Sequence, residues 1–330
     1  YYEKALRGQP GLFETIKNAR GQKIKEGIKT QPESGQSLIL SLDADLQRKL
    51  QSKLSQVLLE INARKGVAIA LDPSSGEILA LVSLPSFDNN LFSQGKDSEK
   101  IKKILQNPDQ PLFNRAVAGL YASGSVIKPL IATAALQEKI ISPEKQILDK
   151  GYIEIKNQYN PEVTYVFHGV EAPGLYNMRR AIALSANIYF YTIGGGYLDQ
   201  KGLGLSRIKK YLELFGWGRK TNIDLPQEAA GFIPDSAWKK EVIGESWYIG
   251  DTYNLSIGQG YLQITPLQLA VAFAGIANGG KIYEPRLVQK IIQGTPQDPK
   301  VIQEFTPKVS SELNFDPQNL EIVRQGMRDG

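Results

Sequence analysis

A serine and a lysine stand three residues apart in the stretch Tyr-Ala-Ser-Gly-Ser-Val-Ile-Lys-Pro, which spans residues 121–129. In a helix that begins near Ser125, residues three apart share a face, so the Ser125 hydroxyl and the Lys128 amine are expected side by side. A serine hydroxyl is too weakly acidic to attack a carbonyl without a base, and a lysine can be that base when burial lowers its pKa. The pair predicts a nucleophile, Ser125, with Lys128 as its base.

The surroundings of Ser125 carry more weight than the spacing. Gly124 precedes it, and the following residues 130–136 are apolar except for Thr133. Such a helix should be buried and should draw Lys128 inward, while its N-terminus favours a developing negative charge. The same spacing recurs in polar segments, where it is incidental. These other pairs are Ser93/Lys96, Ser142/Lys145, Ser206/Lys209 and Ser236/Lys239.

A second polar element follows a predicted helix over residues 178–184 and contains Ser185 and Asn187. Taken alone, these two residues are typical of helix-end hydrogen bonding. Together with the Ser125 pair, they become candidates for a shared site. A Lys220-Thr221 pair is a weaker candidate for a third element, because Asn222 follows it where a glycine would be expected.

Composition excludes several kinds of chemistry. The chain has 330 residues with no cysteine and one histidine, His168, so cysteine nucleophiles, cysteine zinc sites and multi-histidine metal sites are excluded. A Ser-His-Asp triad would have to use His168, which is more readily interpreted as a loop or strand-end residue. No metal and no cofactor are expected. The net charge is +5, but lysines and arginines are scattered, so nucleic acid is not an expected partner.

The elements expected to position the site begin with a strand over residues 38–42 and a helix for which Asp43 is a good N-cap. A β-hairpin follows, with strands over 67–71 and 77–83 around a turn rich in Pro, Ser and Gly. These two strands are expected in the middle of a sheet, with the preceding helix against one face.

Further elements are predicted from the spacing of apolar residues and from residues that start or end helices. Residues 85–114 are expected to run over the surface, and residues 142–174 to form a polar, strand-rich insertion. Thr265 and Pro266 punctuate the start of a helix that runs to residue 277. Other helices are expected over 203–215 and after Asp316-Pro317.

Two divisions of the chain are predicted. Residues 1–34 are polar and interrupted by glycines, as expected for the end of another module and a linker, whereas residues 35–330 form the main domain. No apolar run approaches the roughly 20 residues that a membrane span requires. Because the chain starts at Tyr1 rather than at a methionine, the sequence does not exclude a membrane anchor before it.

The combination of Ser125-Val-Ile-Lys128 with Ser185-Ala-Asn187 resembles the first two signatures of penicillin-binding proteins and serine β-lactamases. The resemblance covers almost all of residues 35–330 and is strongest to the elongation-type members of class B. The segments that carry it include Asn114-Arg-Ala116, Gly216-Trp-Gly218, Ile223-Asp-Leu-Pro226, Gly250-Asp251 and Gly258-Gln259-Gly260.

The resemblance implies an α+β fold of the penicillin-binding transpeptidase type, in which helices sandwich an antiparallel sheet. It implies a D,D-transpeptidase of the serine-type D-Ala-D-Ala class. Ser125 would attack the peptide, Lys128 would be the base, Ser185 would relay a proton, and Asn187 would hold Lys128 and the substrate. Gly124 and the Gly258-Gln259-Gly260 segment would contribute to substrate binding.

The partners implied are peptidoglycan stem peptides, β-lactam antibiotics and the polytopic glycan polymerase of the elongation machinery. The implied location is the cytoplasmic membrane, reached through an N-terminal helix, with the catalytic domain in the periplasm or extracytoplasmic space. Residues 1–34 would be the end of the pedestal domain.

Two departures from the family pattern leave alternatives open. Ala122 and Ser123 stand where the family usually has prolines, and no Lys-Thr-Gly or Lys-Ser-Gly occurs in the 330 residues. In the family that motif follows the region where this chain ends, so a transpeptidase domain incomplete at its C-terminus is expected. The alternatives are a non-catalytic scaffold of the same fold and a β-lactam sensor or β-lactamase.

Overall fold

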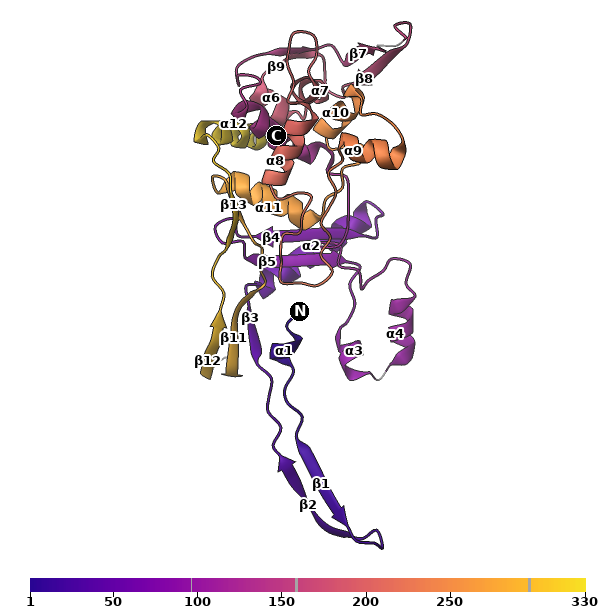
Figure 1. Ribbon diagram of the computed structural model, residues 1–330, viewed down its shortest axis with the longest axis vertical. Helices are drawn as coiled ribbons and strands as arrows, with labels where there is room; N and C mark the ends of the chain where they lie inside the picture. The colour runs from indigo at the N-terminus through magenta and orange to yellow at the C-terminus, as the bar shows by residue number, and fades with distance from the viewer. Residues whose placement is uncertain (96, 158–159, 296–297) are drawn as a thin grey trace.

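The computed structural model describes residues 1–330 except 96, 158–159 and 296–297, so Lys96 of the Ser93/Lys96 pair lies outside the described residues. Three regions follow one another along the long axis of the molecule (Figure 1). A long hairpin lies at one end, a small sheet with its covering helices lies in the middle, and a mainly helical lobe lies at the other end.

The middle region is built on an antiparallel strand pair in which Gly66 faces Leu84. It confirms the predicted hairpin and the helix before it, since the Asp43 carboxylate accepts hydrogen bonds from the Asp45 and Leu46 amides. The elements of this region are β4 (Gly66–Leu71), β5 (Ile78–Leu84), α2 (Ala44–Glu60) and α11 (Pro266–Ala277).

Helices cover both faces of this strand pair, as the α+β prediction required. Ala68 of β4 packs with Leu58 of α2, whereas the adjacent Val67 and Ile69 pack against the main core, to which α11 contributes Val271. Successive side chains of a strand point to opposite faces, so α2 and α11 lie on opposite sides. Figure 1 shows α11 between this pair and the helical lobe.

One expectation for this sheet is wrong for the residues that the structure describes. The two strands do not lie in the middle of a larger sheet but form a two-stranded sheet. Among the described residues, the pair has one further strand-like contact, an isolated parallel bridge between Glu77, directly before β5, and Arg286. No other described strand supplies the ladder hydrogen bonds that would extend the sheet.

The helical lobe is centred on α5 (Lys128–Gln137), whose residues 128–136 are all buried. A helix that is buried on every side is expected to be apolar all round, and the buried helix predicted from this segment is confirmed. The other helices of the lobe are α6 (Met178–Ala183), α7 (Asn187–Gly195), α8 (Gly204–Leu214), α10 (Ile249–Ser256) and α12 (Pro317–Arg328).

The predicted strand-rich insertion is also confirmed. It contains two separate antiparallel pairs, β6 with β9 and β7 with β8. It lies at the end of the lobe that is farthest from the long hairpin (Figure 1). The strands are β6 (Ile147–Asp149), β7 (Tyr152–Lys156), β8 (Thr164–His168) and β9 (Gly174–Tyr176).

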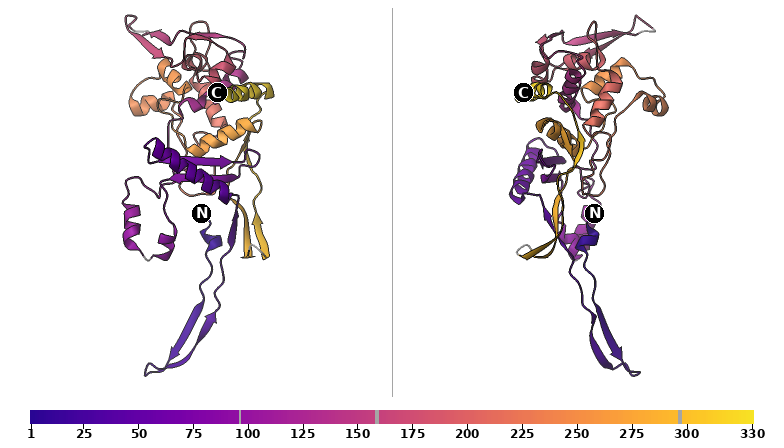
Figure 2. Two further views of the ribbon diagram at one scale, coloured as in Figure 1. Left: turned by 180° about the vertical axis from the view of Figure 1, so that it is seen from behind. Right: turned by 60° about the vertical axis from the view of Figure 1, so that its left-hand side comes forward.

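The N-terminal hairpin projects away from the rest of the chain, as both views in Figure 2 show. Every residue of its two strands is exposed. Next to its base, a three-stranded sheet joins β3 to β11 and β12 (Figure 1). A two-stranded sheet joins β10 to β13 and lies beside α11. These elements are α1 (Glu3–Leu6), β1 (Leu12–Lys17), β2 (Lys23–Thr30), β3 (Ser37–Leu40), β10 (Lys281–Tyr283), β11 (Val288–Thr295), β12 (Asp298–Glu304) and β13 (Val309–Glu312).

Short helices complete the fold. The surface segment 85–114 contains two helices rather than only loop, and a π-helical turn follows a single turn of α-helix later in the chain. These are α3 (Asn90–Gln94), α4 (Ser98–Leu105), α9 (Ser236–Trp238) and η2 (Lys239–Ile243). Among the described residues, no helix combines the length and apolar character needed to cross a bilayer.

Candidate active site

Ser125 lies in a 3-10 turn, η1 (Gly124–Ile127), directly before the buried helix α5. The expected helix is therefore present, but its α-helical part begins at Lys128 and not at Ser125. Ser125 is exposed, whereas Lys128 is only 2% exposed. An exposed serine thus stands three residues before a buried lysine.

The 3-10 turn is held in place by a second glycine far along the chain. The Gly124 amide donates to the Gly258 carbonyl at 2.9 Å. A Cβ on Gly258 would lie 2.1 Å from the Gly124 carbonyl oxygen, and the Gly258 φ of +72° favours glycine. A bridge between Tyr121 and Ile264 fixes the same two segments. Gly258 therefore allows the close backbone approach that positions the turn carrying Ser125.

Lys128 directs its donors at two residues of the predicted second element. Its Nζ donates to Ser185 Oγ at 2.9 Å, to Asn187 Oδ1 at 2.6 Å and to the Ser185 carbonyl. Three acceptors match the three N–H bonds of an ammonium. Among the hydrogen bonds of the described residues, none joins Lys128 Nζ to Ser125 Oγ. The amine is therefore held by Ser185 and Asn187, and not by the serine nearest in sequence.

The environment of Lys128 also changes its acidity. Burial lowers the pKa of its amine from 10.5 to about 8, and the negative charge of Glu171 acts in the opposite direction. The ring of Phe190 lies 5.6 Å from Nζ. A lysine with a pKa near 8 has an appreciable neutral fraction at physiological pH, which a general base requires.

Ser185 has an unusual backbone conformation that turns it toward Lys128. Its φ is +57°, a left-handed value at the C-terminal end of α6. The Ser185 amide donates to the Ile182 carbonyl at 3.1 Å, and the Ala186 amide donates to the Ala181 carbonyl at 2.9 Å. This is a Schellman helix end, where glycine is the usual residue. A serine is strained here, and in this conformation both its carbonyl and its hydroxyl accept from Lys128.

Asn187 is the first residue of α7, and its position depends on a residue that the sequence analysis missed. The Asn187 amide donates to Glu171 Oε2 at 3.0 Å. Glu171 lies between β8 and β9, sixteen positions upstream. No local pattern in the sequence marks Glu171, because the contact depends on how the strand-rich insertion folds against α7.

The other predicted site residues form no hydrogen bond with Lys128 in the described part of the chain. Gln259 and Gly260 are exposed and, unlike Gly258, have no hydrogen bond to the Ser125 turn among the described residues. Thr221 donates to the Glu228 carboxylate at 2.5 Å, which gives it a structural partner. His168 is an exposed residue at the end of β8, as its strand-end interpretation predicted.

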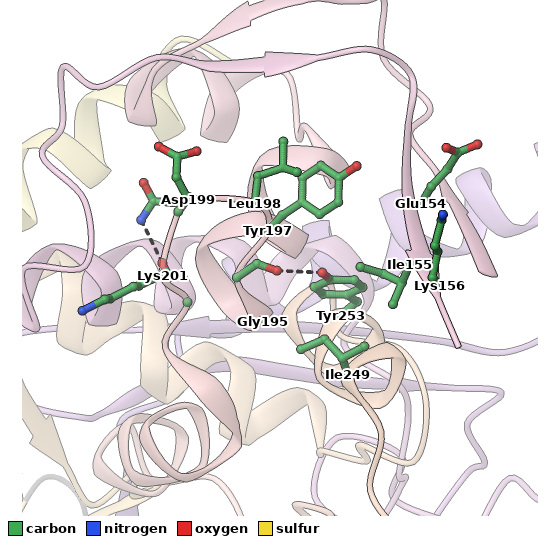
Figure 3. A pocket seen from close by; sticks show the side chains of 13 residues that line it. Glu154, Ile155, Lys156, Gly195, Tyr197, Leu198, Asp199, Lys201, Ile249 and Tyr253 are labelled. Carbon is green, nitrogen blue, oxygen red and sulfur yellow. Dashed lines mark hydrogen bonds between the residues drawn. The ribbon is translucent and has the colours of Figure 1, made fainter. Parts of the chain in front are cut away.

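A separate open hollow of about 690 Å³ lies at the far end of α7 (Figure 3). Residues 154–156 of β7, residues 195–202, and Ile249 and Tyr253 of α10 line it. The nine residues of α7 span about 13 Å, so this hollow is well separated from Asn187. It is therefore not the site formed around Lys128. The described residues contain no group of three or more histidine or acidic side chains able to hold a metal.

Comparisons with known proteins agree on one family. Residues 66–329 match the family described as the penicillin binding protein transpeptidase domain. The peptidoglycan D,D-transpeptidase MrdA of Haemophilus influenzae is 36% identical over 317 residues, which cover 94% of this chain and 46% of that protein. The chain spans about half the length of the curated relatives it matches.

Two solved structures extend the comparison. One is a structure of a peptidoglycan synthase complex that coordinates polymerization and crosslinking. It has a TM-score of 0.82 at 30% identity, and the match covers 99% of this chain and 55% of that chain. Another is a complex of penicillin-binding protein 2 with MreC from Helicobacter pylori. It has a TM-score of 0.77 at 28% identity, and the match covers 99% of this chain and 55% of that chain.

Proposed function

The chain belongs to the penicillin-binding protein transpeptidase family, and from that premise we propose that it is the catalytic part of an elongation-type peptidoglycan D,D-transpeptidase. One observation carries the proposal. A lysine 2% exposed, with a pKa lowered to about 8, lies three residues after an exposed serine and is held by Ser185 and Asn187. This arrangement suits a serine nucleophile activated by a neutral amine.

The reaction proposed is acyl transfer in two steps. In the first, the neutral Lys128 amine takes the proton from Ser125 Oγ while that oxygen attacks the carbonyl between two D-alanine residues of a stem peptide. The carbon–nitrogen bond then breaks, and the leaving nitrogen receives a proton relayed from Lys128 through the Ser185 hydroxyl. D-alanine departs, and the remaining acyl group is an ester on Ser125.

In the second step, the amine of another stem peptide attacks the ester and forms the cross-link. Lys128 again takes a proton from the nucleophile, and the proton returns to Ser125 Oγ as the ester breaks. The amide of Ser125, in the first turn of η1, would supply one donor to the oxyanion. Donors aimed at the developing oxyanion commonly provide the largest catalytic contribution.

Other roles are assigned within the same proposal. Asn187 holds Lys128 and orients the substrate amide, while Gly124 and the segment Gly258-Gln259-Gly260 form part of the substrate cleft. Residues 1–34 are the end of a pedestal, and residues 35–330 belong to the transpeptidase domain. We propose that the site lies outside the cytoplasmic membrane, next to a glycan polymerase. The similarity to a peptidoglycan synthase complex that coordinates polymerization and crosslinking supports the proposed partner.

The test is acylation by a β-lactam, which would react with Ser125 as a mimic of the peptide. We expect protein expressed from its full gene and incubated with penicillin to gain the mass of one penicillin, and peptide mapping to place the adduct on the peptide that contains Ser125. A folded protein that gains no mass would contradict the proposal. Rapid turnover of a chromogenic β-lactam would instead indicate a β-lactamase.

A further inference from the structure

The N-terminus of α7 lacks a cap of its own. Its N-cap residue is Ala186, whose side chain cannot accept a hydrogen bond. The Glu171 carboxylate replaces it: Oε2 accepts from the Asn187 amide at 3.0 Å and from the Val170 amide at 3.3 Å. An anion at this position also interacts favourably with the helix dipole. One carboxylate therefore joins the strand-rich insertion to the helix that begins with Asn187.

The same carboxylate acts on Lys128 electrostatically. Burial lowers the pKa of Lys128, and Glu171 is the acidic group whose charge opposes that effect. The remaining groups that hold Lys128, Ser185 and Asn187, are neutral. The amine thus has neutral hydrogen-bond partners, and among the described residues Glu171 is the acidic group whose charge acts on it.

The charge of Glu171 also acts on two further ionisable groups. Asp149 of β6 is 1% exposed, and its Oδ2 has no hydrogen-bond partner in the described part of the chain. Burial raises the pKa of Asp149, and the charge on Glu171 adds to that rise, so both favour its neutral form. Burial likewise raises the pKa of Tyr191, again with a contribution from Glu171.

We propose that Glu171 is a positioning residue of this site: its carboxylate fixes the N-terminus of α7, and thereby Asn187, and supplies the negative charge that stabilises the Lys128 ammonium. The inference rests on the proposed function, in which Lys128 both accepts and returns a proton. Without a nearby anion, the buried amine would be neutral over a wider pH range and would be slower to take up a proton. With a directly paired anion, it would hold its proton too firmly to act as a base.

The experiment measures the titration of Lys128 itself. Protein labelled with ¹³C at lysine Cε is titrated by NMR, and the Lys128 resonance is identified by its loss in Lys128→Arg. The test variant is Glu171→Gln, which keeps an acceptor for the Asn187 amide but removes the charge. The control is Glu154→Gln, which removes an exposed carboxylate from β7 in the same insertion.

We expect the wild-type midpoint near pH 8. In Glu171→Gln it should move to lower pH by roughly 0.5 unit or more, which is less than the shift a charge in direct contact produces. Glu154→Gln should titrate like the wild type. A Lys128 midpoint that is the same in folded Glu171→Gln as in the wild type would overturn the proposal, and so would an equal shift in Glu154→Gln.

The positioning role has its own measurement. Glu171→Ala removes both the charge and the acceptor, so it should show the same NMR shift as Glu171→Gln together with a lower Tm. Equal Tm values for the two variants would contradict the role at the α7 N-terminus. Neither measurement requires a reaction with a β-lactam. A wild-type protein that is not acylated would therefore defeat the proposed function, whereas an unmoved Lys128 titration would defeat the inference about Glu171.

Discussion

Two buried lysines of this protein lie three residues after a serine, and they have opposite environments. Lys128 follows Ser125 and is 2% exposed, while Lys239 follows Ser236 and is 3% exposed. Lys128 donates to neutral groups of Ser185 and Asn187. Lys239 instead pairs with Asp251 at 2.7 Å and with Glu245 at 3.4 Å.

The difference in partners reverses the effect on acidity. Taken by itself, burial acts to lower the pKa of both amines. At Lys239 the hydrogen bonds and charges of Asp251 and Glu245 outweigh burial and raise the pKa, whereas at Lys128 burial dominates. Spacing and burial together do not make a lysine a base; the amine must also lack a directly paired anion. This comparison explains why one Ser-x-x-Lys pair suits catalysis and the other suits structure.

Replacement of the two serines should give the largest contrast. We expect Ser125→Ala to abolish acylation by penicillin, because it removes the hydroxyl that forms the ester in the proposed reaction. Ser236→Ala should leave the rate unchanged, because Ser236 lies in the short helix α9 beside an ion-paired lysine. Intact-mass spectrometry over time measures both. Acylation that persists in Ser125→Ala would remove the basis of the comparison.

Replacement of the two lysines should separate activity from stability. Lys128→Met should slow acylation by about 10³-fold, the usual contribution of a general base. Lys239→Met leaves Asp251 without its cation, and we expect it to lower the free energy of unfolding by about 2–3 kcal/mol, since a half-buried carboxylate loses its partner. Acylation kinetics and urea denaturation of each variant test the contrast. An equal loss of activity in a folded Lys239→Met protein would contradict it.

The acylation rate should follow the deprotonation of Lys128. The base must be neutral, so the rate rises with pH and reaches half its maximum near pH 8. For a single group this gives an increase of about fivefold between pH 7 and pH 8. A rate that stays flat across this range, or that rises only near pH 10.5, would show that burial does not lower the pKa as inferred. Stopped-flow or quenched-flow acylation measures the profile.

Stability should depend on pH with opposite sign at the two sites. The folded pKa of Lys128 lies below the unfolded value, so the unfolded chain binds more protons between about pH 8 and 10.5, and the Lys128 contribution to stability rises across that window. The folded pKa of Lys239 is raised, so its contribution is present below the unfolded pKa and is lost as pH rises through the folded one. Urea denaturation of Lys128→Met and Lys239→Met against pH would show the two trends.

The smallest expected effect concerns the strained backbone of Ser185, whose φ is +57°. Lys239 and its partners Asp251 and Glu245 are not among the residues with positive φ. Ser185→Gly and Ser185→Ala both remove the hydroxyl that accepts from Lys128. Only glycine relieves the left-handed conformation, so Ser185→Gly should be more stable than Ser185→Ala by about 1 kcal/mol. Thermal unfolding of the two variants gives this difference. Equal stability would show that Ser185 is not strained.

Much of the architecture could be predicted from local patterns. The Asp43 cap and apolar spacing indicated α2, the turn residues indicated the β4–β5 hairpin, and Thr265 with Pro266 indicated α11. Each of these signals acts over a few residues, through capping, turn geometry and helical spacing. The limit of this reasoning is visible at β4–β5, where the pattern indicated strands but could not indicate how many partners the sheet would have.

For the site, the sequence by itself determined the groups available for chemistry: Ser125, Lys128, Ser185 and Asn187, with no cysteine to compete. Only the tertiary structure decided which of them meet. It turned the donors of Lys128 away from Ser125 and toward residues more than fifty positions later, placed Glu171 at the start of α7, and paired Lys239 with Asp251. Burial, charge and hydrogen bonding depend on distance in space, which local spacing does not fix.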